Sequence, residues 1–273
     1  MKTLSFRFDI DTHKCIRSGV PRLLQLGQKH QVCFSFFLNM GRSISVIESI
    51  KELRKKNPGS ERYDMMSAQA KLGIKDYLEA AVLNPPLSNY KKQIRAIYES
   101  GSELGIHGSK NHALWHKHAG SWSEEKTDAE ILWAIKEIKK VLPDYQLKGF
   151  ASPGWVSPDG LERVLAKYGF SYCADYRCQN KKDVIKMGNY LPYIGVNMLG
   201  EPGGVAFFEN CRVKGMDKNE IVAYAMEAAA LNENTVIYDH PYYAGMKEID
   251  CIGEIIEKAE ESNIKIVTLE SLL

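Results

Sequence analysis

Short runs of apolar residues alternate along the chain with longer segments in which apolar and charged residues recur with the period of a helix. The short runs have the length and the β-branched or aromatic character of buried strands. They are Leu4–Phe8, Cys33–Leu38, Leu104–Ile106, Gly149–Ala151, Ser171–Ala174, Val236–Tyr238 and Ile264–Leu269. The segments with helical period are Val20–His30, Lys126–Val141, Lys218–Leu231 and Glu248–Ser262.

This alternation indicates the α/β fold class and a parallel sheet, because helical crossovers are what join parallel strands. More than six such units predict a barrel related to the TIM fold rather than an open sheet. No linker rich in Pro, Gly or Ser divides the 273 residues, so we expect a single domain over residues 1–273. Residues 57–87, which prolines and a glycine interrupt, are interpreted as an insertion that caps one barrel end.

Composition and charge argue against some classes of protein and add nothing to the predicted fold. The chain has 36 Lys and Arg against 34 Asp and Glu, a formal net charge of +2, whereas nucleic-acid binders typically show a marked basic excess. No apolar run approaches the roughly 20 residues that span a bilayer, and the first residues show no signal-peptide pattern. We therefore expect a cytoplasmic protein with reduced thiols and no nucleic-acid partner, for which peripheral membrane contact stays open.

Two carboxylates, Asp9 and Asp11, stand at the end of the first apolar strand. Because side chains alternate along a strand, one carboxylate can bind a metal while its neighbour, pointing the same way, stays free to accept a proton. In barrel enzymes the carboxyl ends of the strands carry the active site. The alternative interpretation of this pair is helix capping or solvation of a loop.

Histidines cluster after the third predicted strand. Four of the seven histidines lie between residues 107 and 118, and His107 itself ends an apolar run. Neutral imidazoles are the commonest metal ligands near neutral pH, so the cluster indicates a metal site. Since not all four can be ligands, we expect His116 and His118 to lie at the surface.

Three further segments follow predicted strands and carry groups suited to a substrate site. His240 could donate a proton to a leaving group, although an isolated histidine there is more often packed or capping. Pro153 fixes a turn beside Trp155, whose ring could wall an apolar pocket or belong to the core. Asp175 and Arg177 could pair with each other at the surface or orient groups of the site.

Together and in this order, the segments resemble the polysaccharide deacetylase (NodB-like) family, and within it the deformylase group that acts on formamido-arabinose linked to undecaprenyl phosphate. The resemblance covers nearly the whole chain, and its short matches are collinear. They are Arg7–Thr12, Gly19–Leu24, Ser35–Phe37, Asn39–Arg42, Glu103–Gly108, Trp115 with Trp122, Pro153–Trp155, Asp175 with Arg177, and His240.

The resemblance implies a distorted (β/α) barrel and a hydrolase that removes an acetyl or formyl group from an amide nitrogen. It implies that one aspartate and two histidines, Asp11, His107 and His112, bind a divalent metal ion. Zinc is the first expectation for this ion, and cobalt or manganese are the alternatives. Asp9 would then be the general base and His240 the general acid.

The implied substrate is an amino sugar or a lipid-linked sugar. Trp115 and Trp155 offer faces on which a sugar ring could stack, and Pro153 shapes the turn that carries Trp155. Asp175 and Arg177 would orient the substrate or other groups of the site. A lipid-linked precursor fits a chain with no export signal, and it would bring the protein to the inner face of a membrane.

Two departures from the family pattern leave alternatives open. His107 and His112 are five residues apart where the family's histidines are usually four apart. Either a one-residue insertion restores the site, or Asn111 takes the position of the second ligand. In addition, Val156 stands where the deformylase group has an arginine, and Arg177 is a candidate for its replacement.

Three functions are therefore compatible with the sequence. The first is a metal-dependent deacetylase or deformylase of an amino sugar. The second is a hydrolase of a non-sugar amide on the same barrel, and the third is a metal-free glycan-binding relative. Metal analysis separates the first two from the third, and a substrate screen separates the first from the second.

Overall fold

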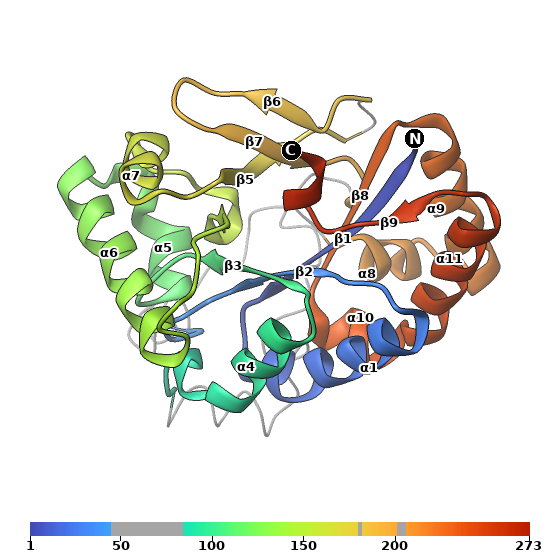
Figure 1. The fold of residues 1–273 in the computed structure, drawn as a ribbon, viewed down its shortest axis with the longest axis horizontal. Coiled ribbons are helices and arrows are strands. Elements are labelled where there is room, and N and C mark those ends of the chain that lie inside the picture. Colours follow the sequence, from blue (N-terminus) through green and yellow to red (C-terminus); the bar gives the residue numbers. More distant parts are fainter. Residues whose placement is uncertain (45–83, 180–181, 201–205) are drawn as a thin grey trace, which may run out of the picture.

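The computed structural model describes residues 1–44, 84–179, 182–200 and 206–273. Within these ranges a twisted sheet runs through the molecule, with helices to its left, below it and to its right, while β6 and β7 form the upper edge in this view (Figure 1). Most of the predicted insertion over residues 57–87 lies outside the described residues, which include only its last four positions, from Asn84.

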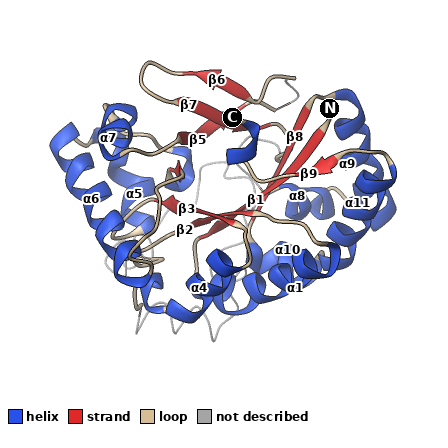
Figure 2. Cartoon of the chain, viewed as in Figure 1, coloured by secondary structure: helices blue, strands red, loops and turns tan. Residues whose placement is uncertain are grey.

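Parallel strands form the sheet, as the apolar runs predict (Figure 2). The strands are β1 (Thr3–Ile10), β2 (Ser35–Leu38), β3 (Glu103–His107), β4 (Gly149–Ala151), β5 (Tyr172–Arg177), β6 (Ile185–Met187), β7 (Pro192–Val196), β8 (Asn234–Asp239) and β9 (Lys265–Ile266). Their order is β6-β7-β5-β4-β3-β2-β1-β8, with β9 paired to β1. The antiparallel hairpin of β6 and β7 is an addition to the predicted strands.

The two ends of the sheet meet at the residues that follow β7. Met198 forms a bridge to β8, in which Met198 N donates to Val236 O and Tyr238 N donates to Met198 O, each at 3.0 Å. The Asn197 side chain accepts from Val236 N (2.8 Å) and donates to Asn234 O (3.0 Å). The sheet is therefore a distorted barrel that closes through two residues, and the predicted fold class is confirmed.

Helices cover the outer face of this barrel (Figure 2). They are α1 (Val20–His30), α4 (Lys91–Glu99), α5 (His112–His118), α6 (Glu124–Val141), α7 (Leu161–Tyr168), α8 (Phe207–Val213), α9 (Lys218–Leu231), α10 (Pro241–Lys247) and α11 (Ile249–Glu261). Short turns of other helix types are Cys15–Gly19, Leu87–Asn89, Ala119–Ser121, Pro153–Trp155 and Glu270–Leu272. The four helices predicted from Val20, Lys126, Lys218 and Glu248 onward are present, and α6 begins two residues before its predicted start, where the Ser123 hydroxyl accepts from Lys126 N.

Alternation along β1 sends its side chains into two different interiors. Leu4, Phe6 and Phe8 pack in the core between the sheet and the helices. The intervening Arg7 and Asp9 face into the barrel, where Arg7 contacts aromatic rings of the second apolar cluster. The period of two that makes β1 a strand thus also places two buried charges inside the barrel.

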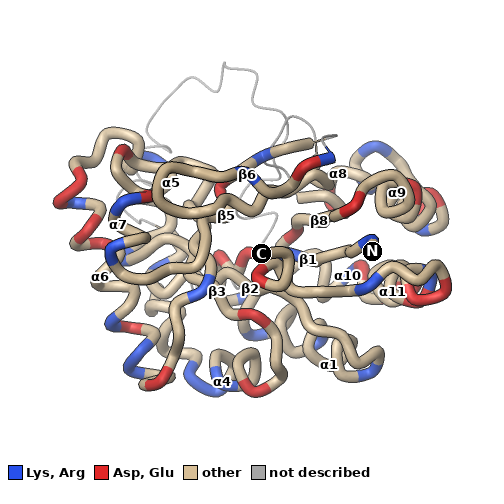
Figure 3. Tube along the Cα trace, turned by 45° about the horizontal axis from the view of Figure 1, so that its top comes forward, with Lys and Arg blue, Asp and Glu red and all other residues tan. Residues whose placement is uncertain are grey.

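Charged residues of both signs are interspersed over the outer helices, including α6, α9 and α11 (Figure 3). This distribution agrees with the near-balance of charge in the sequence. Among the helices of the described ranges, none combines the length and the apolar character needed to cross a bilayer.

Candidate metal centre

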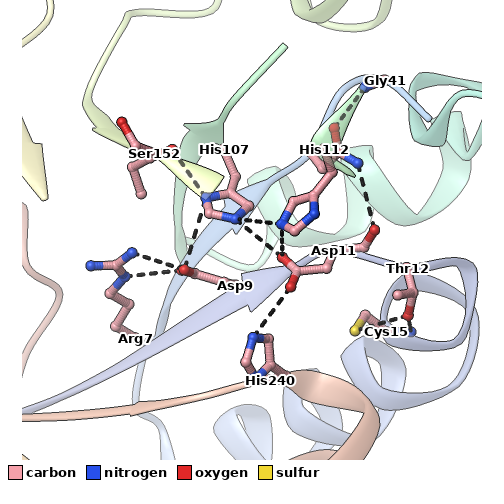
Figure 4. Close-up of polar contacts among 12 residues, drawn as sticks. Arg7, Asp9, Asp11, Thr12, Cys15, Gly41, His107, His112, Ser152 and His240 are labelled. Atoms are coloured by element: carbon pink, nitrogen blue, oxygen red, sulfur yellow. Dashed lines mark hydrogen bonds and ion pairs between the residues drawn. The ribbon is translucent and has the colours of Figure 1, made fainter. Parts of the chain in front are cut away.

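Asp9 and Asp11 lie at the carboxyl end of β1, which runs between β2 and β8, and residues from β3 and β8 also arrive there (Figure 4). Asp9 is within the strand, and Asp11 follows its last residue. The two carboxylates have different main neighbours: Asp9 pairs with Arg7 and lies 3.8 Å from His107 Nδ1, whereas Asp11 lies among three imidazoles. The predicted pair therefore separates into two distinct environments.

Three atoms from Asp11, His107 and His112 face a single point. Asp11 Oδ1 lies 3.2 Å from His107 Nε2 and 3.4 Å from His112 Nε2, and the two nitrogens are 3.3 Å apart. Ligand atoms around a tetrahedral zinc ion, with bonds of about 2.0–2.1 Å, are separated by roughly 3.3 Å. Asp11 Oδ1 is buried without a hydrogen bond of acceptable geometry. This donor set and its spacing fit a divalent cation.

The orientation of His107 is fixed by the neighbouring strand. Its Nδ1 lies 3.0 Å from the carbonyl oxygen of Ala151, at the end of β4. A carbonyl can only accept, so in the neutral ring Nδ1 carries the proton and Nε2 presents its lone pair to the three-atom group. A backbone carbonyl behind a ligating imidazole is the usual way in which proteins fix this tautomer.

The two candidates for the second histidine position have different roles. Asn111 caps α5: its Oδ1 accepts from Leu114 N (3.0 Å), and its Nδ2 donates to Ile44 O (3.0 Å). His112 is the first residue of α5, and its ring reaches Asp11. The structure therefore brings His112, rather than Asn111, to the Asp11–His107 pair.

Electrostatics at Asp11 favour positive charge. Burial alone would raise the pKa of the Asp11 carboxyl, but His112, His240 and His107 outweigh burial and hold that pKa well below its ordinary value. Burial likewise lowers the pKa of His107, yet Asp9 and Asp11 raise it above the ordinary value on balance. Carboxylate and imidazoles each stabilise the other's charged form, as they would stabilise a bound cation.

Asp9 is held by Arg7, two residues earlier on the same face of β1. Arg7 Nε donates to Asp9 Oδ1 (2.9 Å) and Nη2 donates to Oδ2 (2.8 Å), so the contact is bidentate. Arg7 is 0% and Asp9 2% exposed. The third nitrogen, Nη1, donates to the carbonyl of Ala174 on β5 (2.5 Å). The fork geometry fixes the orientation of both carboxylate oxygens.

Three aromatic rings enclose the Arg7 guanidinium. Its central carbon lies 4.4 Å from the ring centroid of Trp155, 5.0 Å from that of Phe37 and 5.2 Å from that of Tyr238. Such contacts favour a buried cation. Arg177, the predicted replacement for the missing family arginine, has an exposed side chain at the end of β5. The guanidinium beside Asp9 thus comes from β1 and not from β5.

His240 approaches Asp11 from the other side (Figure 4). Its Nε2 lies 3.3 Å from Asp11 Oδ2 and 3.1 Å from the Tyr238 hydroxyl. Asp239 fixes the backbone there, because its carboxylate accepts from His240 N (2.7 Å) and from Phe208 N (2.8 Å). The imidazole is therefore anchored next to the three-atom group without belonging to it.

The turn that carries Trp155 is held from both sides. Asp175 accepts hydrogen bonds from Ser152 N (2.7 Å) and from the Ser157 hydroxyl (2.6 Å), so it orients the turn. Pro153 is buried against Gly108, where an added Cβ would lie 2.5 Å from the proline ring. These contacts leave the partly buried ring of Trp155 on the guanidinium of Arg7.

The prediction that Trp115 stacks on a sugar is corrected by its burial. Trp115 is 0% exposed, packs on Trp122 and Phe150, and donates from Nε1 to the carbonyl of Val156 (2.9 Å). Trp115 is therefore the core residue of α5, and no face of its ring remains exposed to a ligand. His116 and His118 are exposed, as expected.

Sequence reasoning missed Arg7 and Tyr238 as site residues. Both stand inside predicted strands, and Arg7 has no predicted role although it begins the family-like segment Arg7–Thr12. The signal was present for Arg7, because a charged residue two positions before Asp9 on a buried strand must share its face. Tyr238 stands two positions before His240 in the same relation.

The distorted barrel, with its candidate metal centre at the carboxyl ends of the strands, agrees with what comparison with known families finds. The model of polysaccharide deacetylases matches residues 1–173, so the chain belongs to the polysaccharide deacetylase family. Over 281 aligned residues it is 26% identical to a Shewanella sediminis protein assigned as a 4-deoxy-4-formamido-L-arabinose-phosphoundecaprenol deformylase. The alignment covers 99% of this chain and 85% of that protein.

Solved structures show the same fold. A Mycobacterium smegmatis protein described as a polysaccharide deacetylase superposes with a TM-score of 0.63 at 15% identity, over 99% of this chain and 89% of that one. A CE4 family pseudoenzyme from Bacillus anthracis superposes with a TM-score of 0.57 at 12% identity, over 99% of this chain and 65% of that one. Because the second of these structures is described as a pseudoenzyme, the fold alone does not establish activity. An argument for activity has to come from the residues of the site.

Proposed function

We propose that the protein is a metal-dependent N-deacylase of an amino sugar, with a lipid-linked formamido sugar as the first substrate class. The convergence of Asp11, His107 and His112 on one point, with Asp9 and His240 beside it, carries this proposal. The Shewanella sediminis relative supports the choice of acyl group and lipid carrier, because its name specifies a formamido sugar on phosphoundecaprenol.

Asp11, His107 and His112 would hold the metal ion, for which zinc is the first candidate and cobalt or manganese are the alternatives. One carboxylate and two imidazoles are a donor set that leaves room for water and substrate. A divalent ion there supplies Lewis acidity, which polarises a carbonyl oxygen and makes water a better nucleophile. The carbonyl behind His107 Nδ1 keeps the other ring nitrogen available to the ion.

Asp9 and His240 would move the two protons of the hydrolysis. Asp9, oriented by Arg7, accepts a proton from water as the water oxygen bonds to the amide carbon. His240 donates a proton to the nitrogen as the carbon–nitrogen bond breaks, because without this proton the nitrogen would have to leave as a strongly basic anion. The products are a carboxylic acid and a free amine. Each positioned acid or base typically contributes about 10²–10⁴-fold.

The test combines metal analysis with a substrate panel. The purified protein is analysed for bound metal, and amine release is measured from N-formyl and N-acetyl amino sugars, free and polyprenyl-phosphate-linked, and from simple amides. We expect a stoichiometric divalent metal and the fastest release from the lipid-linked formamido sugar. Equal turnover of simple amides would indicate the non-sugar hydrolase. Absence of both metal and turnover would indicate the glycan-binding relative.

A lipid-linked substrate also requires contact with a membrane surface. We propose that this contact is peripheral, since the described helices offer no span. Flotation with liposomes that do or do not contain the lipid-linked sugar tests the point. Binding and activity that do not depend on the lipid would contradict it.

A further inference from the structure

The segment between His107 and His112 is anchored by a buried carboxylate of α6. Glu130, 4% exposed, accepts a hydrogen bond from the Ser109 hydroxyl and a long one from Lys110 N (3.5 Å) through Oε2. Its other oxygen, Oε1, contacts the ammonium groups of Lys126 (2.5 Å) and Lys110 (3.3 Å). One side chain therefore contacts two consecutive residues of this segment.

The loop after β2 contacts the same segment through backbone groups. Arg42 N donates to Lys110 O (2.9 Å), and His112 N donates to Arg42 O (2.8 Å). A Cβ at Gly41 would lie 2.2 Å from the carbonyl oxygens of both Ser109 and Lys110, so the two backbones are in direct contact. The segment is thus clamped between the Gly41–Arg42 loop and Glu130.

This clamp bears on the unusual spacing of the two imidazoles. Four residues lie between His107 and His112, and each additional unconstrained residue adds conformational entropy that binding a ligand must remove. A ligand set must be held within about 0.5 Å of its productive geometry to be effective. Contacts to the intervening residues are the means by which a long segment can meet that requirement.

We propose that Glu130 is a positioning residue of the metal centre, which holds Ser109 and Lys110 so that His112 reaches Asp11 and His107. The inference rests on the proposed function, because it presupposes that these three residues bind a metal ion. Glu130 acts as a carboxylate: burial opposes its charge, but Lys126, Ser109 and Lys110 together lower its pKa below the ordinary value. A neutral side chain cannot satisfy the hydroxyl, the amide and two ammonium groups at once.

The experiment compares Glu130→Gln and Glu130→Ala with a matched control on the same helix. Glu137 also accepts from a serine, Ser88 (3.4 Å), and pairs with a lysine, Lys140 (2.5 Å), but its partners lie outside residues 107–112. Dissociation constants for zinc and cobalt are measured by chelator competition, at a temperature where circular dichroism shows each metal-free variant folded. The absorption spectrum of the cobalt form reports the ligand geometry directly.

We expect metal affinity to fall about 10-fold for Glu130→Gln and up to about 100-fold for Glu130→Ala, as for other groups that support ligands. The cobalt spectrum should change in both, and Glu137→Gln should match the wild type in affinity and spectrum. Unchanged affinity and spectrum in the Glu130 variants would overturn the inference. A wild-type protein that binds no metal would instead overturn the proposed function, and this inference with it.

A variant that removes less of the contact keeps the test decisive if the Glu130 variants do not fold. Ser109→Ala deletes only the hydroxyl that Glu130 accepts from, and it leaves the lysine contacts in place. We expect a smaller loss of affinity in the same direction. Affinity and cobalt spectrum equal to those of the wild type would reject the positioning role.

Discussion

Each end of the barrel holds a carboxylate, buried in Glu103 and partly buried in Asp11, and the two carboxylates have different hydrogen-bond partners. Glu103, at the start of β3, accepts from the Ser35 hydroxyl (2.6 Å) and Glu270 N (3.2 Å) with one oxygen and from the Tyr172 hydroxyl with the other. Asp11, at the opposite end, lies among imidazoles, and its Oδ1 has no hydrogen bond of acceptable geometry. Uncharged donors complete the first carboxylate, whereas the second remains open to a cation.

The pKa values follow the same division. Burial raises the pKa of Glu103 above its ordinary value, and hydrogen bonds only moderate the effect. The three imidazoles overcome burial at Asp11 and lower its pKa. In barrels, residues at the amino ends of strands serve stability and those at the carboxyl ends serve function. Strand β3 shows both, with Glu103 at one end and His107 at the other.

The largest effect is expected from Asp11→Asn, which removes the one carboxylate of the three-atom group. Metal binding and turnover should both be lost. Saturating zinc should stabilise the wild type by roughly 4 kcal/mol at a concentration 1,000 times the dissociation constant, and the variant not at all. Thermal unfolding with and without zinc measures this difference. A variant that zinc still stabilises to the same extent would place the metal elsewhere.

Asp9→Asn comes next, because it removes the proposed base and leaves the three-atom group intact. Turnover should fall by about 10²–10⁴-fold, while metal content stays at the wild-type level. Single-turnover kinetics together with metal analysis separate the two quantities. Near-normal turnover would remove Asp9 from the mechanism, and loss of metal would show that Asp9 belongs to the ligand set.

Much of this site could be predicted from the sequence, because residues that follow parallel strands meet at one edge of the sheet. Asp11, His107 and His240 each follow or end an apolar run, so their convergence required only the strand assignments. The choice between Asn111 and His112 could not be made in this way. It depends on the direction in which α5 begins, which the cap contacts of Asn111 set.

Other features were hidden because one residue type serves two roles. Trp115 could be read as a sugar platform or as a core residue, and only its burial decides. The closure of the barrel rests on the backbone of Met198 and on the side-chain amide of Asn197, which makes two hydrogen bonds to β8. Contacts between residues distant in sequence leave no periodic signal.

Arg7 extends the comparison to Asp9. It supplies the hydrogen-bond donors of this buried carboxylate, as Ser35, Tyr172 and the backbone do for Glu103. Arg7→Met should lower the free energy of unfolding by about 3–5 kcal/mol, because it leaves the buried Asp9 charge unpaired. Arg7→Lys should lower it less, yet it loses the bidentate contact that orients Asp9, so turnover should still decrease. Urea denaturation and steady-state kinetics report the two effects.

The double variant Arg7→Met with Asp9→Asn provides the control for that prediction. If the cost comes from an unpaired charge, neutralising Asp9 should restore part of the lost stability, and the two effects should not be additive. Strict additivity would mean that Arg7 contributes through its packing on the Trp155 ring and not through Asp9.

The smallest effect is expected from Glu103→Gln. The informative quantity is how the difference in unfolding free energy between this variant and the wild type changes with pH. The folded state raises the pKa of Glu103 above 4.5, so between the two pKa values folding takes up a proton and wild-type stability falls as pH rises. The glutamine variant lacks this slope. It should be less stable than the wild type by roughly 1–3 kcal/mol near the unfolded pKa, because one hydrogen-bond donor then faces an amide NH₂.

Chemical denaturation from mildly acidic to neutral pH should therefore show the stability gap between wild type and Glu103→Gln becoming narrower, while metal affinity and turnover stay unchanged. A gap that widens with pH would mean that Glu103 is stabilised as a carboxylate, like Asp11. In that case both Glu103 and Asp11 would be stabilised in their charged forms. The difference between the two ends of the barrel, which the uncharged donors around Glu103 indicate, would not hold.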